Sequence, residues 1–149
     1  MHRLALALLI LFAASVATAA ETVAGRLRIS AAYSYETPAP GITAGGYLSI
    51  RNTGKAADRL LRIESSLASS VEIHEMSMAG GVMKMRALSD GLALPAGKTV
   101  SLAPGGFHLM IFGTRKAFMH GEKIPLTLHF AKAPAATVML EVRERPAAE

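Results

Sequence analysis

Short apolar–polar alternations, each closed by glycine or proline, run along the chain from residue 25 onward. A period of two places alternate side chains on opposite faces of a β-strand, and no stretch keeps the 3.6-residue apolar period of an amphipathic helix. Strands spaced about ten residues apart are typical of a single all-β sandwich or barrel. We predict strands over residues 25–33, 45–51, 58–63, 69–75, 84–88, 98–102, 107–112, 124–130 and 137–142.

The N-terminal residues have the features of an export signal. Met1–Arg3 is short and positively charged, residues 4–16 are apolar, and Ala17–Ala19 offers the small residues that a signal peptidase recognises. The apolar run is shorter than the roughly 20 residues of a spanning helix, so we expect an exported protein without a membrane span. The predicted organisation is a signal peptide over 1–19, cleaved after Ala19 or Ala20, and one domain over 20–149.

Composition narrows the function classes. The chain has no cysteine, so we expect neither disulfides nor a lipid attached to an N-terminal cysteine. It carries a formal net charge of +5 with the basic residues scattered, and it has no tryptophan. A nucleic-acid groove needs clustered cations and stacking aromatic side chains, so we expect no nucleic-acid partner.

Histidine and methionine are concentrated between residues 74 and 110. This segment holds two of the five histidines and five of the eight methionines. His74–Met76 and His108–Met110 both have the pattern His-x-Met. Imidazole and thioether without thiolate is a ligand set that favours Cu(I) over zinc, calcium or magnesium. The segment is therefore a candidate copper site.

Strand alternation predicts where these side chains point. The apolar residues at 71 and 73 claim the core face of one strand, which puts His74 on the opposite face. The apolar residues at 107, 109 and 111 likewise put His108 and Met110 together on the face away from the core. Methionine is commonly core filler, but here the core face is already occupied by other apolar residues.

The glycine pair Gly80–Gly81 predicts a two-residue hairpin turn. Facing side chains in a hairpin lie about 5 Å apart and diagonal ones roughly 7–8 Å, gaps that thioether side chains can span to a shared ion. A row of exposed methionines also suits a protein-binding surface. In the predicted register Met78 faces Met83, Met76 faces Met85, and His74 lies diagonal to Met85.

The spacing of four of these residues resembles the motif of periplasmic copper chaperones of the PCu(A)C type. Ten residues separate His74 from Met85, 22 separate Met85 from His108, and one separates His108 from Met110. The surrounding sequences are also similar to that family, and the resemblance covers roughly residues 24–143. The similar stretches are VEIHEM, GVMKMR, LPAGKTVSLAPGGFHLMIFG and IPLTLHF.

The resemblance implies a periplasmic protein with a Greek-key β-sandwich, cupredoxin-like or immunoglobulin-like, that binds one Cu(I). We expect a monomer. It implies delivery of copper to the dinuclear copper centre of cytochrome c oxidase, alongside Sco-type thiol proteins. Some relatives carry a His/Met-rich tail for a second copper, and because this sequence has none we do not expect a separate Cu(II) site. The implied ligands are His74, Met85, His108 and Met110, with Met76, Met78 and Met83 as auxiliary candidates or a transfer path.

Two alternatives remain open at the level of sequence: copper sequestration without delivery, and a copper-free interaction module that uses the methionine surface. We do not expect an enzyme. A blue-copper carrier requires a cysteine thiolate, and the carboxylates are too scattered to suggest a catalytic pair. His120, in a basic loop, and His129, on a strand, are not implied as ligands, and we expect His129 at the surface.

Overall fold

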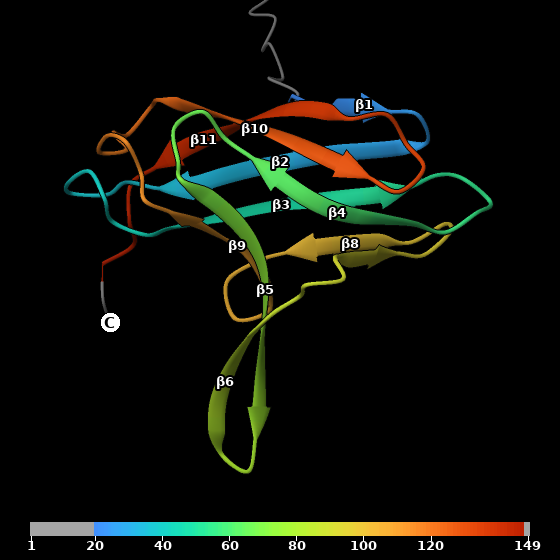
Figure 1. Ribbon diagram of the computed structural model, residues 1–149, viewed down its shortest axis with the longest axis horizontal. Coiled ribbons are helices and arrows are strands. Elements are labelled where there is room, and N and C mark those ends of the chain that lie inside the picture. Colours follow the sequence, from blue (N-terminus) through green and yellow to red (C-terminus); the bar gives the residue numbers. More distant parts are fainter. Residues whose placement is uncertain (1–19, 148–149) are drawn as a thin grey trace, which may run out of the picture.

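The computed structural model describes residues 20–147 and is all-β, as the sequence predicts (Figure 1). The predicted signal peptide lies outside the described residues. None of the described residues forms a helix long and apolar enough to cross a membrane. The strands are β1 (Thr22–Ala24), β2 (Leu27–Tyr35), β3 (Ala44–Asn52), β4 (Asp58–Glu64), β5 (Ser70–Ala79), β6 (Val82–Ala87), β7 (Leu92–Leu94), β8 (Thr99–Leu102), β9 (Phe107–Phe112), β10 (Lys123–Phe130) and β11 (Ala136–Arg143).

Each of the nine predicted strands is present, and β9 has the predicted bounds. The main difference is β5, which continues past its predicted end at Glu75 to Ala79 because it pairs with β6 there. Strands β1 and β7 were not predicted. They have three residues each, too few for an alternation to be recognised, and they form by pairing with the edges of β2 and β4.

Hydrogen bonding joins seven of these strands into a closed, sandwich-like ring. The order is β2–β11–β10–β4–β5–β9–β3, and β3 pairs back to β2. Neighbours in the ring are often distant in sequence, as when β4 lies between β10 and β5, which is the connectivity of a Greek-key fold. Closure leaves few unpaired strand edges. Among the described strands only β11 and β2 pair in parallel.

The interior of the ring is aliphatic. Along β10 the side chains of Ile124, Leu126 and Leu128 are fully buried, and the residues between them face outward. Leu48 and Ile50 of β3 point inward as predicted. Burying a side chain of this size contributes about 1.5–3 kcal/mol relative to exposing it, so this core can stabilise the domain without disulfides.

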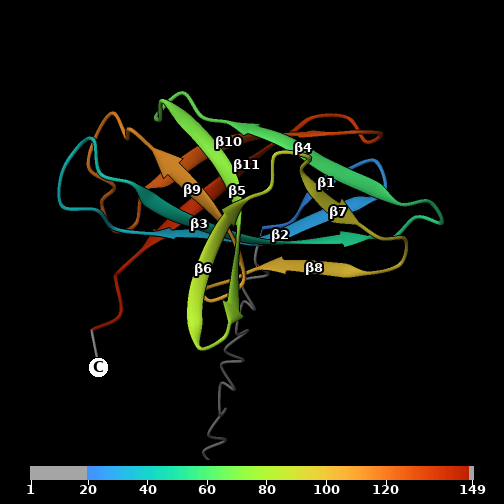
Figure 2. The same cartoon turned by 60° about the horizontal axis from the view of Figure 1, so that its bottom comes forward.

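The β5–β6 hairpin projects from the body of the sandwich (Figures 1 and 2). Gly80 and Gly81 have φ values of 58° and 75°, the left-handed pair that a type I′ turn requires and that glycine adopts without strain. The turn gives the predicted register, in which Met76 pairs with Met85 and Met78 with Met83. Every residue of β6 is exposed.

Candidate metal centre

His74 and His108 are brought side by side where the hairpin leaves the body, with their rings tilted by 46°. They are direct partners in the antiparallel β5–β9 ladder, and their ring centroids lie 5.9 Å apart. With metal–nitrogen bonds of about 2 Å, two imidazoles that share an ion have centroids at most ~6.4 Å apart. The observed separation is therefore compatible with one shared ion. Both side chains lie on the predicted face, opposite Ile73 and Leu109, which are buried.

His108 is held by the backbone. Its Nδ1 lies 3.0 Å from the carbonyl oxygen of Gly106. A carbonyl only accepts, so Nδ1 carries the proton, and Nε2 keeps a free lone pair. The same carbonyl accepts the backbone N–H of Met76 at 3.1 Å, which ties the Gly106 loop to β5. The side chain is also more buried than the sequence suggested: His108 is only 5% exposed although it faces away from the aliphatic core.

His74 is oriented by a carboxylate instead. Its Nε2 lies 2.8 Å from Oε2 of Glu72, two residues earlier on β5. An ionised carboxylate only accepts, so Nε2 is the protonated nitrogen. Nδ1 of His74 is buried, and it is the one buried side-chain nitrogen or oxygen without a hydrogen-bond partner in the described part of the chain. A buried acceptor without a partner is costly, and a bound metal ion would satisfy it.

Met110 lies on the same face beside this histidine pair. It follows His108 by two residues on β9, and it pairs with Glu72 of β5 and Gly45 of β3. Its side chain is half-buried. The hydroxyl of Tyr47 lies over Gly45, where a Cβ atom would stand 2.8 Å from it.

Met85 lies on the same face but on the other side of His74. It is 51% exposed and diagonal to His74, as the hairpin register predicts. Met85 pairs with Met76 on one edge of β5, and Met110 pairs with Glu72, four residues earlier, on the other edge. In a flat sheet the Cα atoms of Met85 and Met110 would therefore be about 16 Å apart. Two methionine side chains with metal–sulfur bonds of about 2.3 Å reach ~13 Å. All four residues can therefore share an ion only if the hairpin twists or bends toward β9.

The auxiliary candidates follow the hairpin outward. Met76 is half-buried opposite Met85. Met78 and Met83 face each other near the turn and are 65% and 61% exposed. The structure thus separates the methionines into those beside the histidines and a pair near the hairpin tip.

Two residues of this site were missed from the sequence. Glu72 shares a strand face with His74 and precedes it by two residues, so the alternation carried a signal for their contact. The role of Gly106 had no such signal, because its carbonyl is positioned by the loop between β8 and β9.

The other two histidines in the described chain lie away from the pair. His129, on β10, is half-buried, and its Nε2 lies 3.0 Å from Oε2 of Glu64 on β4. His120 is exposed in the loop before β10. The expectation that His129 lies at the surface is met in part, because its side chain is half-buried.

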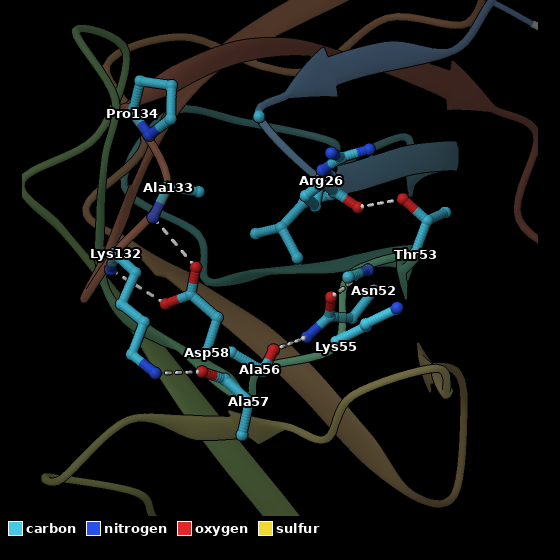
Figure 3. A pocket seen from close by; sticks show the side chains of 13 residues that line it. Arg26, Asn52, Thr53, Lys55, Ala56, Ala57, Asp58, Lys132, Ala133 and Pro134 are labelled. Atoms are coloured by element: carbon cyan, nitrogen blue, oxygen red, sulfur yellow. Dashed lines mark hydrogen bonds between the residues drawn. The ribbon is translucent and has the colours of Figure 1, made fainter.

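A pocket of about 550 Å³ lies elsewhere, between the β1–β2 turn and the loops that follow β3 and β10 (Figure 3). Its walls are braced by hydrogen bonds from the amide of Asn52 to the carbonyl of Ala56 and from Nζ of Lys132 to the carbonyl of Ala57. The carboxylate of Asp58 accepts the backbone N–H groups of Lys132 and Ala133. These contacts hold the loops together, and neither histidine nor methionine lines the pocket.

The solved structures that align with this fold include two PCuAC domains. The copper-bound PCuAC domain from PmoF2 aligns with a TM-score of 0.70 and 26% identity over 85% of this chain and 99% of that domain. The apo PCuAC domain from PmoF1 gives a TM-score of 0.71 at 21% identity, over 85% of this chain and 100% of that domain. Apo-DR1885 from Deinococcus radiodurans gives 0.61 at 23% identity over 97% and 96% of the two chains.

Sequence comparison identifies the family. The chain is 35% identical over 104 residues to a putative lipoprotein, Lxx21020, from Leifsonia xyli subsp. xyli (strain CTCB07). The match spans 70% of this chain and 62% of the length of that relative. The family model "Putative lipoprotein LpqE-like" matches residues 27–142, which is most of the described domain. The chain therefore belongs to the LpqE-like family, and its domain has the fold of PCuAC domains.

Proposed function

We propose that this protein is an exported Cu(I)-binding protein that holds one ion with His74, Met85, His108 and Met110. The observation that carries the proposal is the in-register histidine pair, in which each ring is oriented by a partner and keeps one nitrogen lone pair free. The likeness to a copper-bound PCuAC domain at 26% identity supports it.

The donor set suits a monovalent soft ion. Two neutral imidazoles and two thioethers bring no charge, and thioethers bind Cu(I) in preference to the harder Cu(II). The partners of the rings fix their orientation: Glu72 holds Nε2 of His74, and the carbonyl of Gly106 holds Nδ1 of His108. Such outer contacts raise the basicity of a ligating imidazole.

A competition titration tests the site. Cu(I) is added anaerobically to the purified protein in the presence of a chromophoric Cu(I) chelator. We expect one tight equivalent, largely lost in His108→Ala and in Met110→Ala. His129→Ala is the matched control, because His129 is also paired with a glutamate but lies on β10, and it should bind normally. Unchanged tight binding in both site variants would refute the assignment.

We further propose that the protein delivers copper rather than stores it, with the dinuclear copper centre of cytochrome c oxidase as recipient. The exposure of Met85 on a projecting hairpin supports delivery, because a partner can reach an ion held at that edge. Neutral ligands also release Cu(I) more readily than thiolates would.

The test of delivery mixes the Cu(I)-loaded protein with the copper-free soluble domain of the oxidase subunit, with and without a Sco-type thiol protein. We expect copper to move to the oxidase domain or to the thiol protein. Copper that stays with this protein in both mixtures would favour sequestration.

A further inference from the structure

The methionines of the hairpin form a ladder that leads from the histidine pair to the tip. Met76 pairs with Met85, and Met78 pairs with Met83 one step further out. The backbone N–H of Leu88 donates to the carbonyl of Ile73 at 2.8 Å, which fixes the hydrogen-bonded positions of this ladder. Both methionine pairs therefore occupy non-hydrogen-bonded positions of the ladder, where facing Cα atoms are only about 4.5 Å apart.

These methionines do not pack into a hydrophobic core. Met78, Met83 and Met85 are more than half exposed, and every residue of β6 is exposed. The opposite face of the hairpin is polar over Glu75, Ser77, Lys84 and Arg86. An ion pair there links the two strands, since Nη2 of Arg86 lies 2.6 Å from Oε2 of Glu75. The hairpin therefore presents a soft, sulfur-rich face to solvent, which costs hydrophobic free energy.

We propose that Met78 and Met83 form a second, weaker Cu(I) site at the hairpin tip, from which the ion passes by way of Met76 and Met85 to the histidines. Two facing thioethers supply two soft ligands, and solvent or a partner's side chain completes the coordination. Because this site has two protein ligands where the inner one has four, it fills second. The inference rests on the proposed copper function.

The spacing allows passage without free copper. Successive pairs are separated by about 7 Å along the strands, and the histidine level lies about 13 Å from the tip. Flexible methionine side chains cover each step, with one Cu–S bond forming as another breaks. The oxidation state stays Cu(I) throughout, so no oxidant or reductant is needed. The arrangement makes the tip the contact point for a partner that donates or receives Cu(I).

The test labels the methionine methyl groups with ¹³C and follows them by NMR during anaerobic titration of the purified protein with Cu(I). We expect the first equivalent to shift Met85 and Met110, and the second to shift Met78 and Met83 in faster exchange. In the double variant Met78→Leu/Met83→Leu the second step should be lost while the first keeps its affinity. Leucine preserves volume and apolarity but cannot ligate.

Met139→Leu is the control, because Met139 is an exposed methionine (47%) on β11, away from the hairpin. It should retain both steps. The inference is overturned if the tip methyl groups do not shift, or if the second step survives in the double variant. His108→Ala separates the two claims: it removes the first step and leaves the tip shifts. If the unmodified protein shows no tight first binding step at all, that result would instead count against the proposed function.

Discussion

Oε2 of Glu72 lies 2.8 Å from Nε2 of His74, so this carboxylate sets which ring nitrogen of His74 is free. We expect Glu72→Ala to weaken Cu(I) binding about 10- to 100-fold, the usual cost of losing such a contact. Glu64→Ala is the matched control, because Glu64 holds His129 in the same way outside the site. Competition titration measures both variants. Equal affinities would show that the Glu72 contact does not serve the metal.

Copper should draw the hairpin toward the body. Met85 can share an ion with Met110 only if β6 approaches β9, and a metal bond at Met85 would tie the exposed β6 to the domain. We expect backbone amide exchange over residues 82–87 to slow on loading with Cu(I). In Met85→Leu we expect the other three ligands to hold the ion more weakly. Amide exchange over residues 82–87 should then not slow on loading. Slowing confined to β9 in the unmodified protein would exclude Met85 as a ligand.

Asp58 should make the fold sensitive to strong acid. Burial opposes its ionisation, but the backbone N–H groups of Arg59, Ala133 and Lys132 and the charge of Lys132 outweigh it, so the pKa of Asp58 is lowered from its ordinary 3.8. The carboxylate thus stabilises the fold fully above about pH 4 and loses this effect as pH falls through the lower native pKa.

The variant Asp58→Asn should destabilise the protein by about 1 kcal/mol at pH 7, because it replaces an acceptor by a donor in a partly solvated contact. The difference from the unmodified protein should shrink below pH 3.8. Thermal unfolding at several pH values measures it. Asp90→Asn is the control, because its carboxylate accepts no hydrogen bond in the described part of the chain. A difference that persists unchanged in strong acid would contradict the role given to Asp58.

Two effects oppose any larger residue at position 91: a positive φ and a steric clash with the backbone of β4. The φ of Gly91 is +80°, and a Cβ atom there would stand 2.2 Å from the carbonyl oxygen of Leu60, a backbone atom of β4. Gly97 has a φ of +70° with nothing within 4 Å. We expect Gly97→Ala to cost about 1 kcal/mol from backbone strain alone, and Gly91→Ala at least about 3 kcal/mol. Denaturant unfolding measures both, and similar values would contradict the steric argument.

Alternation along single strands allowed much of the fold to be predicted. The bounds of β9 and the facing of Met76 and Met85 follow from local pattern and turn chemistry, because a Gly-Gly turn of two residues fixes the register. The closure of the ring did not follow. The parallel pairing of β11 with β2 joins distant segments, and no residue pattern of either strand specifies its neighbour.

The same division holds for the site: the sequence predicts the strand face on which its residues lie, but not how the strands pair. The face that carries His74, His108 and Met110 follows from the pleat, but their pairing needs the register of β5 against β9, which is set by the whole ring. The burial of His108 and its bond to Gly106 depend on a loop whose path is determined by tertiary contacts. The bending needed to bring Met85 to Met110 likewise appears only once both edges of β5 are known.

X-ray absorption at the copper edge tests the central claim most directly. For the protein loaded with one equivalent of Cu(I), the proposed site predicts two nitrogen neighbours at about 2.0 Å and two sulfur neighbours at about 2.3 Å. In Met110→Leu the sulfur contribution should fall to one neighbour. A spectrum with nitrogen and oxygen neighbours only, or a sulfur contribution that Met110→Leu leaves unchanged, would contradict the proposed site.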